Sequence, residues 1–320
     1  MRTPCQVLVT GASGFVGSAL CESLVGEGFS VKAAVRRMPA NPIAGEVISV
    51  DLCDQESMTS HLAGVDCVVH LAGRAHVLND QVQNPLELFR VANVETSLAL
   101  ARSAIAAGVK RFVFVSSIGV NGATTSAEAF NENSAVSPVA AYAHSKLEAE
   151  VALQALVQGT TMELVVVRPP LVYAASAPGN FARLLSLVEK NIPLPFARLG
   201  NRRTMISLGN LVDFLTLTIA HEKASNQLFL ISDCQSVSTG QIVEALSVGM
   251  GQKARLFYMP GLLMKFALTL AGKKGIYTQL FSSLEVDSRK AQNLLGWIPR
   301  EKPVEALIEA GKSYKQRRPL

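Results

Sequence analysis

The first 170 residues alternate short apolar runs with helical patterns, and this alternation limits the fold more than any other feature of the chain. Six runs are rich in Val, Ile and Phe and apolar on both faces: "QVLVT", "FSVKAAV", "EVISV", "DCVVHLA", "RFVFVSS" and "ELVVVRP". Such runs are typical of parallel strands covered by helices on both sides. Between them, "GSALCESLVGEG" and "VETSLALARSAIAAG" are helical patterns that end in Gly, a common helix stop. The alternation predicts an α/β fold with a doubly wound parallel sheet.

The pattern changes after Arg168. The segment "PPLVYAASAPGN" is rich in Pro, Gly and Ala, which predicts a loop that leaves the sheet. Helical and irregular sequence follows, interrupted by the strand-like "QLFLISD". We therefore expect a sheet domain in residues 1–170, to which about 206–232 return. The rest of 171–320 is expected to form a smaller, discontinuous C-terminal lobe.

Composition argues against several other classes of protein. The five cysteines are odd in number and show no CxxC spacing, so neither a disulfide framework nor a metal site is expected, and a cytoplasmic location fits best. The net charge is +5, but no long basic run accompanies it, so nucleic acid is not an expected partner. The most apolar stretch, "LFYMPGLLMKFALTLAG", contains Pro260 and Lys265. It is shorter than the roughly 20 apolar residues of a membrane span, so it predicts a second-lobe helix, with an amphipathic surface helix as the alternative.

A glycine-rich turn follows the first predicted strand. In "VLVTGASGFVGSAL", three glycines stand between the strand and the start of a helix. Small residues permit a tight turn and a close approach of pyrophosphate, and the helix N-terminus offers free N–H groups to it. This context predicts a Rossmann dinucleotide site formed by Gly11, Ser13, Gly14, Phe15, Val16 and Gly17.

The end of the second predicted strand bears on the choice of dinucleotide. NAD-binding Rossmann domains often carry an acid there, but this chain has Arg36 and Arg37. Arg36 can meet the 2′-phosphate of NADP, and a solvated surface arginine is the equal alternative, so the cofactor is NAD or NADP. Asp51, followed by Leu52, is placed to reach the adenine amino group. Capping of the next helix competes for Asp51, although Asp54 suits that role better.

Eight motifs occur in an order and spacing that resemble one family. They are "TGASGFVGS", "VVHLAG", "VANVETS", "VFVSSIGVNG", "AYAHSKLEAE", "VVRPPLVY", "RRTMISLGNLVD" and "VDSRKAQNLLGWIP". The chain resembles the extended short-chain dehydrogenase/reductase family over nearly its whole length, within the branch of nucleotide-sugar epimerases, dehydratases and ketoreductases. The resemblance implies a dinucleotide-binding sheet domain, a substrate lobe for a UDP-sugar or dTDP-sugar, and a homodimer formed through helices of the sheet domain.

The resemblance implies a catalytic group of Ser117, Tyr142 and Lys146, with Ser116 as the neighbouring alternative to Ser117. Residues four apart share a helix face, so Tyr142 and Lys146 can cooperate. A free tyrosine has a pKa of about 10, and a nearby ammonium together with an oxidised nicotinamide ring favours phenolate. We interpret the intervening His144 and Ser145 as helix-face residues.

The resemblance also implies binding residues. Beyond the glycine turn, the cofactor would contact Leu71, Ala72, Gly73, Asn93, Tyr142, Lys146 and Pro169. Asn93 would support the helix that carries Tyr142, which is compatible with a buried, hydrogen-bonded asparagine. The substrate would contact Ser117, Asn180 and one of the adjacent Arg202 and Arg203, which suit a diphosphate and which the sequence does not separate.

Three positions depart from the family pattern. The 4,6-dehydratases carry Asp-Glu where this chain has Ile118-Gly119, which argues against dehydration. Asn121 stands where the family has a tyrosine near the sugar. Gln279 is the nearest match to a second diphosphate-binding arginine, so the identity of the nucleotide is less constrained.

Three functions compete at this stage. Overall resemblance favours a 4-epimerase of a UDP-hexose or UDP-N-acetylhexosamine that oxidises C4 transiently. Arg36 favours the alternative, an NAD(P)H-dependent 4-ketoreductase of a UDP-4-keto-6-deoxy-N-acetylhexosamine in surface polysaccharide synthesis. The third is a dinucleotide-sensing binding protein, which the fold permits. The presence of Ser117, Tyr142 and Lys146 argues against it.

Overall fold

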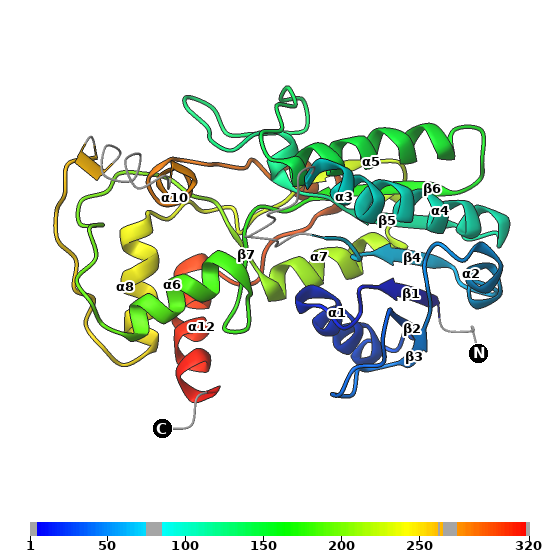
Figure 1. Ribbon diagram of the computed structural model, residues 1–320, viewed down its shortest axis with the longest axis horizontal. Coiled ribbons are helices and arrows are strands. Elements are labelled where there is room, and N and C mark those ends of the chain that lie inside the picture. The colour runs from blue at the N-terminus through cyan, green and yellow to red at the C-terminus, as the bar shows by residue number, and fades with distance from the viewer. Residues whose placement is uncertain (1–4, 75–84, 262, 265–273, 318–320) are drawn as a thin grey trace.

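A seven-stranded parallel sheet forms the centre of the molecule (Figure 1). The computed structural model describes residues 5–74, 85–261, 263–264 and 274–317. The strand order is β3-β2-β1-β4-β5-β6-β9, which confirms the predicted doubly wound α/β class. The strands are β1 (Gln6–Thr10), β2 (Ser30–Val35), β3 (Glu46–Ser49), β4 (Cys67–His70), β5 (Arg111–Val115), β6 (Glu163–Arg168) and β9 (Leu228–Leu230).

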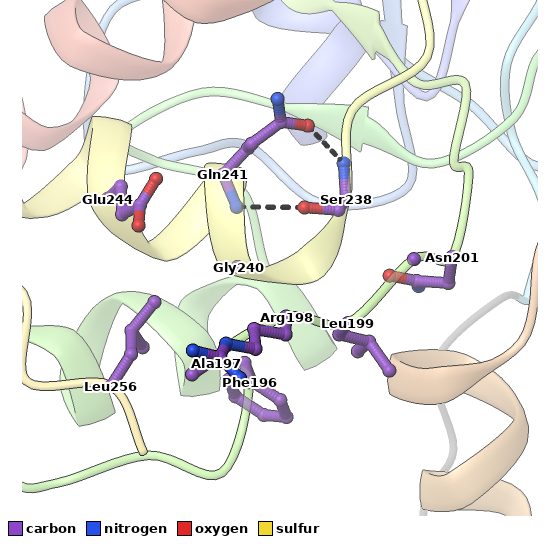
Figure 2. A pocket seen from close by; sticks show the side chains of 11 residues that line it. Phe196, Ala197, Arg198, Leu199, Asn201, Ser238, Gly240, Gln241, Glu244 and Leu256 are labelled. Carbon is purple, nitrogen blue, oxygen red and sulfur yellow. Dashed lines mark hydrogen bonds between the residues drawn. The ribbon is translucent and has the colours of Figure 1, made fainter. Parts of the chain in front are cut away.

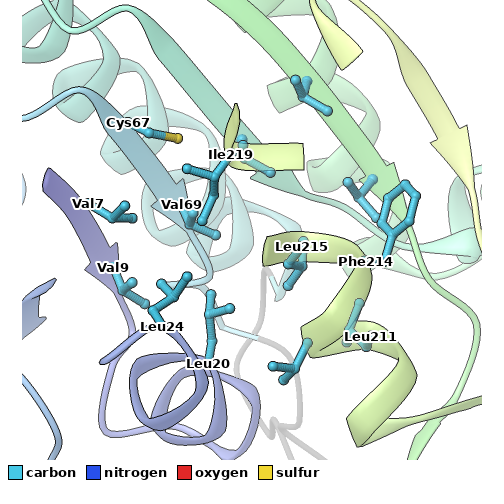
Figure 3. Close-up of a cluster of buried hydrophobic side chains, with 14 of the residues drawn as sticks. Val7, Val9, Leu20, Leu24, Cys67, Val69, Leu211, Phe214, Leu215 and Ile219 are labelled. Carbon is cyan, nitrogen blue, oxygen red and sulfur yellow. The ribbon is translucent and has the colours of Figure 1, made fainter. Parts of the chain in front are cut away.

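Helices cover both faces of this sheet, which explains why its strands are apolar on both sides. On one face lie α1 (Phe15–Gly26) and α7 (Leu208–Ala220). Figure 3 shows their leucines packed toward β1 and β4 in one buried cluster. The other face packs against α2 (Gln55–His61), α4 (Thr96–Ala106) and α5 (Ala141–Val157).

The second lobe lies beyond the carboxyl edge of the sheet and is mainly helical (Figure 1). Its helices α8 (Thr239–Gly249) and α12 (Pro303–Arg317) touch through two glycines. A Cβ on Gly249 would lie 2.0 Å from the carbonyl oxygen of Ile308. A Cβ on Gly311 would lie 2.4 Å from the carbonyl oxygen of Leu246. Larger residues there would separate the two helices. In the described part of the C-terminal half, the other helices besides α7 are α6 (Gly179–Glu189), α8, α10 (Lys274–Phe281), α11 (Arg289–Leu295) and α12. Of these, α11 packs on the sheet, because Ala291 and Leu295 belong to the buried cluster of α1 and α7.

One short region corrects the sequence prediction. The segment after β6, expected as loop, contains β7 (Val172–Tyr173), which pairs in parallel with β8 (Ile206–Ser207). A two-residue strand carries too little periodicity to be recognised in a Pro-rich segment. The remaining short elements are α3 (Pro85–Arg90), the π-helical turn η1 (Val91–Glu95), and the 3₁₀ turns η2 (Ile118–Val120) and η3 (Glu222–Ala224).

The chain returns to the sheet after β8. Strand β9 pairs with β6, with Leu228 opposite Val166. Helix α7, which precedes β9 in the chain, packs on the sheet. The return of the chain at about 206–232 agrees with the expected sheet domain, and the division into residues 1–170 and a second lobe from the rest of 171–320 stays a prediction.

Two further observations concern the remaining expectations from composition. Among the described residues, no helix has both the length and the apolar character that crossing a membrane requires. Within the apolar stretch 256–272, residues 262 and 265–272 lie outside the described part, so the helix expected there is not assessed. All five cysteines are free thiols.

Candidate active site

The turn between β1 and α1 closes so tightly that only glycine fits at two of its positions. Gly11 has φ of 67°, and a Cβ there would lie 2.9 Å from the backbone nitrogen of Ala72. A Cβ on Gly17 would lie 2.2 Å from the carbonyl oxygen of Gly11. Gly14 caps α1, whose first N–H groups lack partners within the helix. The residues present therefore fit a dinucleotide: bare backbone and free N–H groups meet where a pyrophosphate would lie.

Several of the other predicted cofactor residues follow the carboxyl ends of strands. Leu71 to Gly73 follow β4 directly, and Pro169 follows β6. Arg36 is exposed just after β2. Leu52 and the exposed Asp51 follow β3. The cap of α2 is Asp54, whose Oδ1 accepts from the Ser57 N–H at 3.2 Å, as expected; Asp51 instead accepts from the Cys53 N–H.

Lys146 joins the ends of two strands to α5. Its side chain is buried, and Nζ donates to the carbonyl oxygen of Val115, the last residue of β5, at 2.9 Å. A Cβ added to Gly73, after β4, would lie 3.5 Å from Nζ. Burial lowers the pKa of Lys146 to about 8, and the charge of Glu150 acts in the opposite direction.

Ser117 follows β5 and lies against the start of α5. Its Oγ accepts from the Gly119 N–H at 3.1 Å. A Cβ on Gly119 would lie 3.3 Å from Cβ of Ala143, the residue after Tyr142. The neighbouring Ser116 is buried and donates its hydroxyl to Glu150. Ser117 is thus the more accessible of the two serines.

Tyr142 is half-buried in the first turn of α5, with the ring of Phe89 edge-on at 6.1 Å between centroids. Burial raises the pKa of Tyr142 to about 12. This direction is opposite to the one expected from a neighbouring lysine, and its cause is the desolvation of the phenolate by burial.

Asn93 links the end of β4 to α5. It is fully buried in η1, where its Oδ1 accepts from the Arg74 N–H at 2.8 Å and its Nδ2 donates to Ser145 Oγ at 2.9 Å. Ser145 in turn donates to the carbonyl oxygen of Tyr142. Asn93 is therefore both a satisfied buried amide and a direct support for the helix that carries Tyr142. The sequence predicts only that Ser145 lies on a helix face, and it gives no sign of the buried partner, Asn93.

His70 extends this network below the glycine turn. Ser97 Oγ donates to the Asn93 carbonyl oxygen, so it can only accept from His70 Nε2, at 2.9 Å. His70 Nδ1 is then an acceptor for Thr10 Oγ1 at 2.7 Å, and Thr10 accepts from the Ala72 N–H. A neutral imidazole that carries its proton on Nε2 satisfies every member of this chain of hydrogen bonds. In agreement, burial lowers the pKa of His70 to about 3.

The two arginines predicted to bind substrate differ in their partners. Arg202 is exposed and pairs with Glu285 at 2.8 Å. Arg203 is half-buried, donates to the Ser282 carbonyl oxygen at 2.9 Å, and has no carboxylate within ion-pair distance among the described residues. Burial lowers the pKa of Arg203, as expected for a cation without a counter-charge. The structure thus distinguishes two residues that the sequence could not.

Asn180 and Gln279 lie together in the second lobe. Asn180 Nδ2, at the start of α6, donates to Gln279 Oε1, on α10, at 2.7 Å. The position where the family pattern has a second arginine therefore holds a neutral amide pair. Of the two arginines predicted to hold a diphosphate, Arg203 is the one without a carboxylate partner among the described residues.

Two cavities adjoin these residues. One of about 600 Å³ is lined by the loop of residues 121–139, which joins the Ser117 turn to α5. The other, of about 470 Å³, lies between the segment 196–201 and the start of α8 (Figure 2). In Figure 2, Ser238 and Gln241 cap α8 by reciprocal hydrogen bonds, and Asn201 lies at the edge of the cavity beside them. Asn201 precedes the two arginines, so this cavity adjoins the predicted diphosphate site.

The glycine cradle at β1–α1, with a serine after β5 and a Tyr-Lys pair on α5, defines a nicotinamide-dependent protein of the short-chain dehydrogenase/reductase type. Comparison with known families agrees, because the model of the NAD dependent epimerase/dehydratase family matches residues 7–231. The chain belongs to that family.

Individual relatives support the assignment over nearly the full chain. A UDP-glucose 4-epimerase of Vibrio cholerae is 38% identical over 319 residues, 98% of this chain and 97% of that protein. A dTDP-6-deoxy-L-talose 4-dehydrogenase (NAD(P)(+)) of Kitasatospora kifunensis is 26% identical over 321 residues, 96% and 94% of the two chains. The structure of UDP-N-acetylglucosamine 4-epimerase from Bacillus cereus has a TM-score of 0.79 at 19% identity, covering 97% of this chain and 99% of that one. It shows the same fold.

Proposed function

We propose that this chain is a nucleotide-sugar 4-epimerase acting on a UDP-hexose or UDP-N-acetylhexosamine. The observation that carries the proposal is the similarity to a UDP-glucose 4-epimerase along 98% of the chain. The site adds chemical support. Lys146 Nζ donates to the carbonyl oxygen of Val115, two residues before Ser117, and Lys146 shares a helix face with Tyr142. Gly73, which follows the Ala72 that packs against Gly11, lies near Lys146 Nζ.

In the proposed reaction, the side chains of this protein hold the sugar and move one proton. Ser117 hydrogen-bonds O4 of the sugar, and Tyr142 removes the O4 proton and later returns it. Arg203 holds the diphosphate. When bound, the oxidised nicotinamide cofactor supplies a hydride acceptor at C4 and a positive charge. Because that hydride transfer would be reversible, epimerisation would need no net oxidant, and the pocket would have to let the sugar ring rotate between the two proton transfers of Tyr142.

The ionisation of Tyr142 is the demanding step for these residues. Burial raises the pKa of Tyr142 to about 12, whereas a base at neutral pH needs a shift in the other direction. We propose that the Lys146 ammonium, on the same helix face, favours the phenolate when the site is filled. That role requires Lys146 to remain protonated even though burial lowers its pKa to about 8.

We propose that the enzyme does not catalyse dehydration. Elimination of water needs an acid and a base beside the reacting carbons. At the positions after Ser117, this chain has Ile118, which packs in a buried cluster with Leu230 and Val286, and then Gly119. Neither side chain can transfer a proton.

A second candidate is an NAD(P)H-dependent 4-ketoreductase of a UDP-4-keto-6-deoxy-N-acetylhexosamine, used in surface polysaccharide synthesis. Two observations favour it. The relative from Kitasatospora kifunensis is named as a C4 dehydrogenase of a deoxy sugar, the same chemistry in reverse. Arg36 is exposed directly after β2, where it can meet the 2′-phosphate of NADP. The homodimer and the cytoplasmic location stay predictions.

One experiment separates the two candidates. Purified protein is incubated with UDP- and dTDP-sugars without added cofactor, and the nucleotide released on denaturation is identified as NAD or NADP. We expect interconversion of C4 epimers, supported by cofactor that co-purifies. Activity confined to 4-keto sugars, with stoichiometric consumption of NAD(P)H, would replace the epimerase by the reductase.

A further inference from the structure

A buried ion pair lies below the predicted catalytic residues. Arg168, at the end of β6, donates from Nε to Glu150 Oε1 at 3.0 Å and from Nη2 to Oε2 at 2.5 Å. Both side chains are less than a tenth exposed. Glu150 lies on α5, so this two-pronged contact fastens the helix that carries Tyr142 and Lys146 to the sheet.

The same pair holds the Ser117 turn from both sides. Before the turn, Ser116 Oγ donates to the Glu150 carboxylate. After it, Arg168 Nη1 donates to Asn121 Oδ1 at 2.9 Å. Ser117 therefore lies between two residues bound to one ion pair. Asn121, which departs from the family pattern, is itself buried and forms part of this contact.

The pair also determines the charge around Lys146. The ionisable groups that face Lys146 come from three elements: Tyr142 and Glu150 on α5, His70 at the end of β4, and Arg168 at the end of β6 through its contact with Glu150. Glu150 is the one carboxylate in this set of described residues. It lies one helical turn after Lys146, on the same face.

Stability alone does not explain the pair. A buried ion pair pays a large desolvation cost and is often replaceable by apolar residues of similar volume without loss of stability. An apolar pair, however, would neither fix the Ser117 turn by hydrogen bonds nor supply a negative charge near Lys146. The arrangement therefore points to a role in the site.

We propose that Glu150 and Arg168 are positioning residues of the active site. Their pair fixes the Ser117 turn against α5 and keeps Lys146 as an ammonium on the face it shares with Tyr142. The part of this inference that concerns catalysis rests on the proposed function; the part that concerns the ionisation of Lys146 does not.

The chain offers a matched control for the test. Arg111 pairs with Glu163 at 2.6 Å at the opposite ends of the same strands, β5 and β6. Glu150→Gln and Glu163→Gln thus remove the same charge from two pairs of the same type. Protein labelled with ¹³C and ¹⁵N in lysine side chains is titrated by NMR, with the Lys146 signal assigned from Lys146→Met.

We expect Glu150→Gln to lower the titration midpoint of Lys146 by about one pH unit, the size expected for one close opposite charge. The alkaline limb of the pH profile of turnover should shift to lower pH by the same amount. Glu163→Gln should leave both unchanged. An unchanged Lys146 midpoint in folded Glu150→Gln would overturn the inference. If the midpoint shifts in Glu150→Gln but the wild type converts none of the sugars, the inference about Lys146 stands and the proposed function is rejected.

A second variant tests geometry without changing charge and serves if Glu150→Gln does not fold. Arg168→Lys keeps both charges but loses the planar fork that contacts Glu150 and Asn121 together. We expect turnover to fall about tenfold while the Lys146 midpoint stays at its wild-type value, because a misplaced catalytic group costs rate rather than charge. Wild-type turnover in Arg168→Lys would contradict the positioning role.

Discussion

At the amino ends of β5 and β6, Arg111 pairs with Glu163; toward their carboxyl ends, Arg168 pairs with Glu150. The first pair is partly open, because the Glu163 side chain is 36% exposed, against 9% for Glu150. Arg111 also donates to carbonyl oxygens at the end of α7, which completes that helix. The two pairs are alike in chemistry, and their surroundings give them different tasks.

The same contrast holds for other polar groups at the two ends of the sheet. At the amino end, Asp66 accepts from Lys110 and from the Gln6 N–H, and Lys110 is 78% exposed. At the carboxyl end, His70 and Asn93 are both fully buried and hydrogen-bonded. Buried polar networks cost free energy unless every member is satisfied, and they restrict the positions of the groups they contain. This molecule places them at the edge that carries the predicted site.

The largest effect in stability is expected from breaking the two ion pairs in turn. Arg168→Leu leaves the buried Glu150 carboxylate without its ion-pair partner, which should lower the free energy of unfolding by about 3–5 kcal/mol. Arg111→Leu leaves Glu163 accessible to water, so the loss should be smaller, about 1–3 kcal/mol, from hydrogen bonds to α7. Urea denaturation measures both. Equal losses would remove the distinction between the two ends.

A smaller effect, graded with pH, should come from His70. Burial lowers its pKa to about 3 in the folded protein, whereas the unfolded chain protonates near the ordinary value of about 6.5. As pH falls below about 6.5, the unfolded state binds a proton that the folded state does not, so stability decreases by up to about 1.4 kcal/mol per pH unit.

The check is the pH dependence of urea denaturation in wild type and His70→Gln, compared between pH 6.5 and 4.5. The variant should lack the contribution of His70, so its slope should be shallower than that of wild type. Asp66, at the amino end, contributes equally to both proteins. Its pKa is lowered, so its contribution is lost as pH falls below the unfolded value of about 3.9, under the range compared. Identical slopes would show that His70 titrates normally in the folded protein.

The sequence predicted the features that depend on local pattern. The strands follow from runs of Val, Ile and Phe, and the turn at Gly11 and Gly17 follows from a glycine spacing placed at a strand-to-helix junction. The assignment of Ser117, Tyr142 and Lys146 comes from the family resemblance, and the strand pattern adds only that Ser117 follows the end of β5. These inferences need few contacts between distant residues.

The supporting residues were missed because their partners are distant in sequence. Glu150 meets Arg168 and Ser116 only after β5, α5 and β6 are assembled. Signals were present: Glu150 continues the face of Tyr142 and Lys146, and Arg168 is a charge that directly follows the apolar run Leu164–Val167 of β6. Arg202 and Arg203 were inseparable because the choice depends on Glu285, which lies far along the chain.

The most direct measurement is the turnover of Tyr142→Phe on the sugar that the wild type converts, with His144→Ala, two residues along the same helix and exposed, as the control. Loss of a positioned acid–base group should reduce turnover by about 10²–10⁴-fold, with little change in the apparent affinity for the sugar, while His144→Ala stays near wild type. Wild-type turnover in Tyr142→Phe would contradict the assignment of this tyrosine, and with it the account of the site.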